Sequence, residues 1–174
     1  MHGAFAIAAV VASTQALAQP TLPFIGAGLL TPTGLPSPTG VVPLRAIGGV
    51  DVPGSGQWGL VSDFLLDTVS GTGSGTFVFD RGADSLSGTL STSFAVVASG
   101  VGFQMQYTAT AGTGKLAGFG ATGNSLVRLD TGFDGNAPYS YIEAGILNLS
   151  PIPEPSAALL MLGGLALLAR WRRR

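Results

Sequence analysis

The stretch FQMQYTAT, residues 103–110, decides the fold class of this chain. Its apolar side chains, Phe103, Met105, Tyr107 and Ala109, alternate strictly with Gln and Thr. Successive side chains of a β-strand point to opposite faces, so this alternation predicts a strand with one buried face and one solvated face. A helix would instead repeat its apolar positions about every 3.6 residues.

The same period of two recurs on both sides of this stretch. It is present in WGLVSDFLL (58–66), GTFVFD (75–80), LSTSFAVV (90–97) and YSYIEAGILNL (139–149). Turns rich in Gly, Asp and Ser separate these segments, which is typical of consecutive short strands. Residues 57–150 are therefore predicted to form an all-β domain, an antiparallel barrel or sandwich of about six to eight short strands.

The segment before this domain has a different composition. Residues 19–56 contain seven of the eleven prolines, interleaved with glycine and threonine. Such a composition favours extended chain over regular structure, so we expect a leader or linker here. Within it, GVVPLRAIGGVDV (40–52) could contribute one strand.

Charge and composition exclude several classes of function. Residues 19–150 carry four basic and eight acidic side chains, a net charge of minus four, without the basic stripe that a nucleic-acid-binding protein needs. The chain contains no cysteine, and its one histidine is His2. Glu143 is the only glutamate before residue 151. We therefore expect neither catalysis nor a cofactor, and no nucleic-acid partner.

The N-terminus has the pattern of a secretory signal peptide. An apolar run is followed by Ala16-Leu17-Ala18, and small residues at the first and third positions of such a triplet fit a signal-peptidase site. The sequence therefore predicts a signal peptide over residues 1–18, cleaved after Ala18. The protein would then be exported across the cytoplasmic membrane.

The C-terminus combines a short apolar run with a basic cluster. Residues 156–169 are apolar or small, and as a helix they would span roughly 21 Å at about 1.5 Å per residue. A bilayer core is about 30 Å thick, so this helix is a marginal transmembrane span. The membrane stop that follows it consists of Arg170, Trp171, Arg172, Arg173 and Arg174. Trp171 would sit at the interface, and the arginines would hold the C-terminus on the cytoplasmic side.

The element Pro153-Glu154-Pro155 directly precedes this run. The order of tripeptide, apolar helix and terminal arginines in residues 151–174 resembles the PEP-CTERM sorting signal. The resemblance implies a Gram-negative bacterium in which an exosortase recognises the tripeptide and cuts near it. The protein would be anchored transiently in the inner membrane and then passed to the cell surface or to an extracellular exopolysaccharide matrix. Proline on both sides of Glu154 keeps the tripeptide extended, as a protease requires.

A second resemblance concerns the domain itself. YTATAGTGKLAGFGATGNSLVRL (107–129) resembles a Tyr-Thr and Gly-rich stretch of allene oxide cyclase and dirigent-like barrels. Ala111 and Leu116 depart from the pattern, and Phe119 and Gly120 interrupt its end. The resemblance implies a calycin-like barrel, and none of the cyclase's catalytic residues can be placed on this sequence.

One loop offers hard oxygen ligands. Asp130, Asp134 and Asn136 in DTGFDGN lie close together, as calcium would require, although their spacing is not that of an EF-hand loop. A hydrogen-bonded turn is the favoured interpretation of these residues, and a metal site is the alternative.

These observations predict an exported, exosortase-processed surface or matrix protein without catalytic activity, with exopolysaccharide as a candidate partner. The candidates for contact with sugar rings are threonines on the strands, together with aromatic residues such as Trp58, Tyr139 and Tyr141 that would stack on the rings. A barrel that binds a small molecule, or acts on one as a cyclase does, is the alternative, and it predicts an apolar cavity. An ice-binding protein would need a flat ladder of threonines, for which Thr92, Thr108 and Thr110 are too few and too irregular.

Glu154→Ala tests the sorting prediction. In a host that has the exosortase, the unaltered chain is expected to begin at Gln19 and end near Pro153, whereas the variant keeps its C-terminal residues, because the recognised carboxylate is lost. Intact-mass analysis of the purified protein measures this. If residues 170–174 remain on the unaltered chain with and without the exosortase, the tail is a plain membrane anchor.

Overall fold

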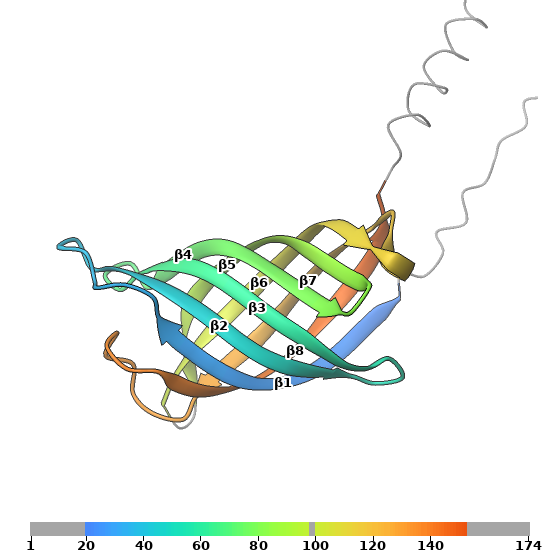
Figure 1. Cartoon of the computed structure of the whole chain (residues 1–174). Helices are drawn as coiled ribbons and strands as arrows, with labels where there is room; N and C mark the ends of the chain where they lie inside the picture. The colour runs from blue at the N-terminus through green and yellow to red at the C-terminus, as the bar shows by residue number, and fades with distance from the viewer. Residues whose placement is uncertain (1–19, 98–99, 153–174) are drawn as a thin grey trace, which may run out of the picture.

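The computed structural model describes residues 20–97 and 100–152, which form a closed antiparallel barrel of eight strands (Figure 1). Side chains are described for these residues except 96, 97 and 100. The strands are β1 (Thr21–Pro32), β2 (Val41–Val52), β3 (Gly56–Asp67), β4 (Thr72–Arg81), β5 (Asp84–Val97), β6 (Gly100–Thr113), β7 (Phe119–Leu129) and β8 (Tyr139–Pro151). A short 3-10 helix, η1 (Gly114–Leu116), lies between β6 and β7. The prediction of an all-β antiparallel fold is confirmed, and of the two predicted architectures the chain adopts the barrel.

The barrel has the simplest possible topology. Each strand pairs with the next one along the chain, and β1 then pairs with β8 from Thr21 opposite Asn148 to Leu30 opposite Tyr139. This last pairing closes the barrel. Closure leaves no strand with a free edge. In an open sheet, the unpaired backbone groups of an edge strand can pair with another chain and cause aggregation.

The prediction that residues 19–56 form a leader or linker is wrong, because they supply two of the eight strands. The prolines are tolerated because they lie near strand ends or in turns: Pro23 is the third residue of β1, Pro32 is its last, and Pro43 is the third residue of β2. Strand ends need fewer ladder hydrogen bonds than strand centres. The predicted strand within residues 40–52 is confirmed as β2, and the domain begins at β1 instead of residue 57.

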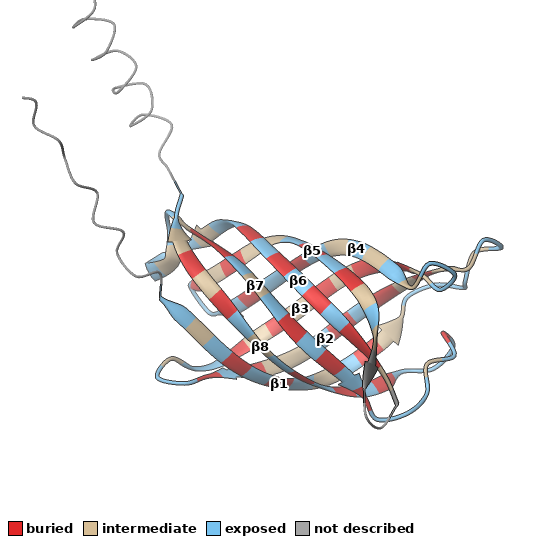
Figure 2. Ribbon diagram, turned by 180° about the vertical axis from the view of Figure 1, so that it is seen from behind, coloured by how far each residue is buried: buried red, intermediate tan, exposed pale blue. Residues whose placement is uncertain are grey.

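Alternating side chains fill the interior, as the buried bands along each strand show (Figure 2). The predicted inward set of FQMQYTAT is confirmed, since Phe103, Met105, Tyr107 and Ala109 are all buried. Tyr107 is part of an aromatic cluster packed edge to face, with ring centroids 4.9 to 6.5 Å apart. The other members of this cluster are Phe24, Phe77 and Phe79. Edge-to-face packing suits the ring quadrupoles and gives the core a defined geometry.

The two ends of the barrel differ. Both ends of the described chain, residues 20 and 152, lie at the end that also carries η1, which we call the terminal end (Figure 1). The loops after β1, β3 and β7 lie at the opposite end, which we call the distal end. The predicted signal peptide with Ala16 and Ala18, and the sorting signal from Pro153 onward, lie outside the described residues. Within residues 20–97 and 100–152, no helix is long and apolar enough to cross a membrane.

An inward glycine lets two neighbouring strands approach. Gly75 on β4 lies opposite Phe64 on β3. A Cβ added at Gly75 would lie 2.0 Å from the carbonyl oxygen of Asp63 and 2.5 Å from the Cβ of Phe64. These neighbours are a backbone atom and the first atom of a packed ring, so neither can move away cheaply.

Gly75→Ala is therefore expected to lower the free energy of unfolding by about 1 to 3 kcal/mol through overpacking. Gly132→Ala is the matched control, because a Cβ there meets no atom within 4 Å. Chemical denaturation of both variants measures the difference. If Gly75→Ala and Gly132→Ala have equal denaturation midpoints, the close approach of β3 and β4 at Gly75 is contradicted.

Candidate functional site

A carboxylic acid lies inside the barrel. Glu143 is at an inward position of β8, and only 2 % of its surface is exposed. Its Oε1 accepts a hydrogen bond from the Tyr107 hydroxyl at 2.6 Å and from the Ser125 hydroxyl at 2.5 Å. These donors come from β6 and β7, so three adjacent strands build the cluster. We call Glu143, Tyr107 and Ser125 the interior acid cluster.

Burial controls the ionisation of this cluster. It raises the pKa of the Glu143 carboxyl above its ordinary value, although the hydrogen bonds from Ser125 and Tyr107 oppose the rise. Burial and the neighbouring Glu143 also raise the pKa of the Tyr107 hydroxyl, and the same two causes raise that of Tyr141. Each neutral form is therefore favoured inside the barrel.

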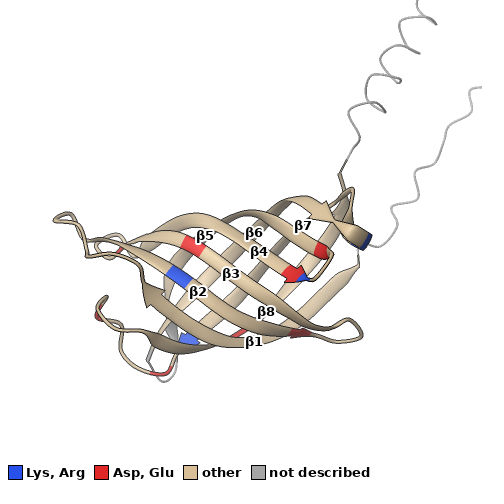
Figure 3. Ribbon diagram, in the orientation of Figure 1, with Lys and Arg blue, Asp and Glu red and all other residues tan. Residues whose placement is uncertain are grey.

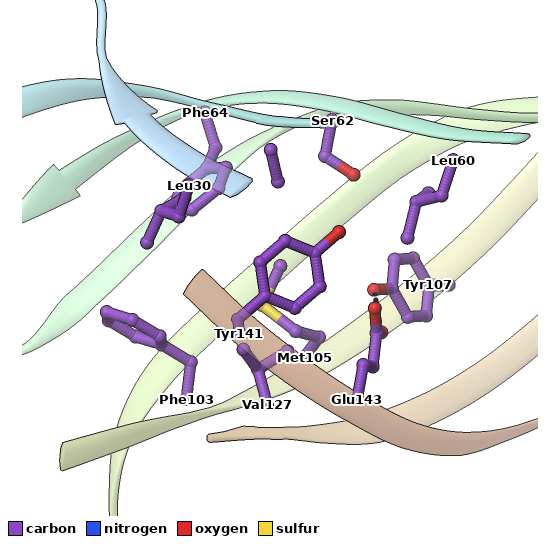
Figure 4. Close-up of a pocket in the computed structure, with 11 residues that line it drawn as sticks. Leu30, Leu60, Ser62, Phe64, Phe103, Met105, Tyr107, Val127, Tyr141 and Glu143 are labelled. Carbon is purple, nitrogen blue, oxygen red and sulfur yellow. Dashed lines mark hydrogen bonds between the residues drawn. The ribbon is translucent and has the colours of Figure 1, made fainter. Parts of the chain in front are cut away.

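A small cavity adjoins the cluster (Figure 4). Its volume is about 20 Å³, and its polar lining includes Glu143, Tyr141 and Ser62. The side chains of Ser62 and Tyr141 point toward one another across it. The Ser62 hydroxyl is buried and has no hydrogen-bond partner among the described residues. Most of the lining is apolar, but the cavity is large enough for one water molecule, which these polar groups could bind.

The interior offers little room for an organic ligand. A second cavity, of about 80 Å³, lies nearer the terminal end and is lined almost wholly by apolar side chains such as Phe24, Trp58 and Phe79. Ligand sites of small-molecule proteins usually occupy about 300 to 1,000 Å³. The interior acid cluster can hold a proton, but the adjoining space is too small for a substrate.

The candidate metal ligands lie in the distal loop between β7 and β8, where they hydrogen-bond to other protein groups. The Asp134 carboxylate accepts hydrogen bonds from the Tyr139 hydroxyl and, at 2.9 Å, from the backbone N–H of Asn136. The Tyr139 hydroxyl, followed by the Asn136 N–H, holds the pKa of Asp134 below its ordinary value. Asp130 is contacted instead by the Thr131 hydroxyl at 3.5 Å. In the described part of the chain, no three acidic or histidine side chains are grouped so as to hold a metal ion.

The aromatic residues predicted to stack on sugars point into the barrel instead of toward solvent. Trp58, Tyr139 and Tyr141 are all buried at inward positions of their strands. Trp58 closes the terminal end, where its Nε1 donates to the Ser55 hydroxyl at 3.1 Å and the Arg81 guanidinium lies 5.0 Å from its ring. Alternation predicts which residues share a face of a strand, but it does not say which face points outward. In this small barrel, the large aromatic side chains lie on the inward face and form part of the core.

The outer surface of β4 to β7 carries a regular array of uncharged polar side chains. We call it the polar wall, and all its members are exposed except Ser93, which is half-buried. Its members are Thr72, Ser74 and Thr76 on β4, Thr89, Ser91 and Ser93 on β5, Gln104, Gln106 and Thr108 on β6, and Thr122 and Asn124 on β7.

Strand register aligns these residues in rows across the barrel. Thr76 lies opposite Thr89, Thr89 opposite Thr108, and Thr108 opposite Thr122. The next row runs from Ser74 through Ser91 and Gln106 to Asn124. Neighbours within a row are about 4.8 Å apart, and successive rows about 7 Å. The result is a grid of hydrogen-bonding groups on a curved, twisted surface, unlike the flat ladder that ice binding requires.

No charged residue belongs to this grid. Charged side chains are sparse on the barrel as a whole (Figure 3). The nearest pair, Arg45 with Asp63, lies beside the polar wall on β2 and β3, where Arg45 Nε is 2.7 Å from the carboxylate. A partner of the polar wall would therefore be recognised through hydroxyl and amide groups instead of charge.

The sequence predicts threonines on strands as sugar contacts, but it predicts neither their alignment in rows nor the interior acid cluster, and the reason is the same for both. The Ser and Thr positions of each strand are visible in the sequence, and so is the single Glu143. Their assembly depends on register between strands, which a lone sequence does not reveal. One signal in the sequence indicates the polar wall. Ser, Thr or Gln stands at every second position in runs such as LSTS and QMQYT.

Comparison with known proteins finds no relative of this chain. No family model, curated protein or solved structure matches the chain. The resemblances to PEP-CTERM signals and to allene oxide cyclase barrels stay predictions from the residues that carry them.

Glu143→Gln tests the interior acid cluster. The raised pKa of Glu143 means that the unfolded chain ionises this group first, so stability is full below the unfolded pKa and is lost as the pH rises toward the folded pKa. The loss approaches about 1.4 kcal/mol per pH unit in that window. The amide cannot ionise, so the variant's free energy of unfolding should vary less above about pH 4.3, the ordinary pKa of Glu.

Denaturant unfolding at a series of pH values from 5 to 9 measures this difference. Glu143→Leu is the comparison variant. It removes the acceptor that the Tyr107 and Ser125 hydroxyls share, so it should be less stable than Glu143→Gln by about 1 to 3 kcal/mol. Parallel pH profiles for the unaltered chain and Glu143→Gln would show that Glu143 ionises normally in the fold.

Proposed function

We propose that this protein is an exported, non-catalytic barrel displayed at the cell surface or in the extracellular matrix, where the polar wall binds a neutral exopolysaccharide. The observation that carries the proposal is the uncharged grid of Thr, Ser, Gln and Asn side chains on β4 to β7. The export and sorting steps rest on the terminal sequence patterns.

Charge favours a neutral polymer over an acidic one. The described barrel carries four basic and eight acidic residues, so an acidic polysaccharide would be repelled. A neutral polysaccharide presents hydroxyl groups that can both donate and accept hydrogen bonds. Thr, Ser, Gln and Asn side chains offer the matching donors and acceptors at regular intervals.

The grid suits weak, repeated contacts. Each hydrogen bond at a solvated surface contributes about 0.5 to 1.5 kcal/mol, and no exposed aromatic ring belongs to the polar wall to add stacking energy. A single barrel would bind weakly. Many copies on one surface, or many sugar repeats on one polymer, would bind strongly through multivalency.

The position of the chain ends supports display. Residues 20 and 152 both leave the barrel at its terminal end, so a C-terminal tether would leave the strand walls uncovered. The filled interior also favours a role for the outer surface. Cavities of about 20 and about 80 Å³ are small for the alternative, a small-molecule carrier or cyclase-like barrel.

The double variant Thr89→Val/Thr108→Val tests the polar wall. It keeps the shape of both side chains but removes two adjacent hydroxyls, so binding to a neutral glucan should weaken about tenfold or more. Affinity electrophoresis of the full chain through gels that contain hydroxyethyl cellulose measures the affinity, and alginate gels provide the acidic comparison.

Thr131→Val, in the distal loop, is the matched control and should migrate like the unaltered chain. The proposal is contradicted if the double variant and the unaltered chain are retarded equally by the neutral glucan. It is also contradicted if alginate retards the unaltered chain more than hydroxyethyl cellulose does.

A further inference from the structure

The outer surface along the middle of β1 and β8 is mostly apolar, in contrast to the polar wall. Outward side chains of β1 and β8 form a narrow strip along the seam where these strands pair, which we call the seam strip. Its members are Pro23, Ile25, Ala27 and Leu29 on β1, and Ser140, Ile142, Ala144 and Ile146 on β8. Ile25 is 71 % exposed, Ile142 is 56 % exposed and Leu29 is 53 % exposed. Contiguous exposed apolar surface of this kind marks an interaction site more often than chance.

The seam strip has a regular internal order. Register pairs Pro23 with Ile146, Ile25 with Ala144, Ala27 with Ile142, and Leu29 with Ser140. In each of the last three rows, one side chain is large and the other is small. The large side chain also changes strand from one row to the next over Ile25, Ile142 and Leu29. The strip is therefore a staggered series of knobs and hollows.

We propose that the seam strip is the interface of a parallel dimer, in which a second copy of this chain packs side by side along the same seam. A two-fold axis parallel to the seam places β1 of one copy over β8 of the other, at the same height. Ile25 then meets the partner's Ala144, and Ile142 meets the partner's Ala27. Each large side chain faces a small one, which gives the interdigitation that a packed interface needs.

The place where the chain leaves the barrel favours this orientation. Both described chain ends lie at the terminal end, and residues 153–174 continue from there. A two-fold axis along the seam keeps the terminal ends of both copies together. Two barrels whose tails enter the same membrane would therefore already be aligned for contact.

Charge also favours a second copy over a lipid surface. No member of the seam strip is charged, so pairing does not require an ionised group to lose water. The barrel as a whole is acidic, with eight acidic and four basic residues, and this charge opposes docking on an anionic membrane.

Single-cysteine cross-linking tests the dimer, because the full chain contains no cysteine of its own. Facing sheets pack about 10 Å apart, and paired strands are offset by about 5 Å, so a short bis-maleimide can join two equivalent positions of the strip. Ala27→Cys and Ala144→Cys, in full chains in a membrane fraction, are expected to give cross-linked dimers. Thr108→Cys, on the polar wall, is the matched control and should stay monomeric.

A cysteine at the terminal end of the seam distinguishes the two possible orientations. Thr21 pairs with Asn148 at this end. Thr21→Cys should cross-link in a parallel dimer, whereas in an antiparallel dimer the two cysteines would lie at opposite ends of the barrels. Cross-linking through Ala27→Cys without cross-linking through Thr21→Cys would overturn the parallel arrangement.

Charged substitutions within the strip test its role directly. Ile142→Glu, added to Ala27→Cys, should lower the cross-linked fraction about tenfold, because a carboxylate would be buried without a partner. Ile25→Glu, on the other strand, repeats the test at a second exposed position. Cross-linking that persists in both variants would overturn the proposal. The proposal would also be overturned if Ala27→Cys and Ala144→Cys stay monomeric. Equal cross-linking through Thr108→Cys would overturn it too, because association of the tails alone would then explain the dimers.

Discussion

The pairing of β1 with β8 is the interaction on which the rest of this structure depends. These strands stand at opposite ends of the described chain, and their ladder from Thr21 and Asn148 to Leu30 and Tyr139 turns a sheet into a barrel. Closure removes two free edges and encloses the interior. Eight antiparallel strands place both chain ends at one end of the molecule, and closure brings these ends side by side, so that a tail can leave without crossing the strand walls.

Closure separates the chemistry of the chain into an inside and an outside. Inside, the buried acid Glu143 lies beside the rings of Tyr107 and Tyr141 and accepts hydrogen bonds from neighbouring strands. Outside, the polar wall and the seam strip occupy different sets of strands. Because side chains alternate, Thr108 belongs to the polar wall while its neighbour Tyr107 belongs to the interior acid cluster. The two proposals therefore depend on different residues and can fail separately.

The prediction of strands succeeded where the two faces of a strand differ in polarity. FQMQYTAT shows this contrast clearly, and its inward residues are confirmed. The contrast disappears in β1, because Ile25, Ala27 and Leu29 are apolar on the outside while Gly26 and Gly28 take two of the inward positions. Without alternation, the prolines are the strongest signal in this segment, and they predict a linker instead of a strand. The same exposed apolar residues that obscured β1 now form half of the seam strip.

The sequence by itself determined what is local: the strands with contrasting faces, the turns between them, the low charge and the absence of cysteine chemistry. Only the tertiary structure decided which residues meet across strands. It aligned four threonines from four strands in one row, placed Glu143 inside, and turned Trp58 toward the core. The physical reason is that alternation is a property of one backbone segment, whereas register arises from hydrogen bonds between neighbouring strands, and closure from hydrogen bonds between β1 and β8 at opposite ends of the described chain.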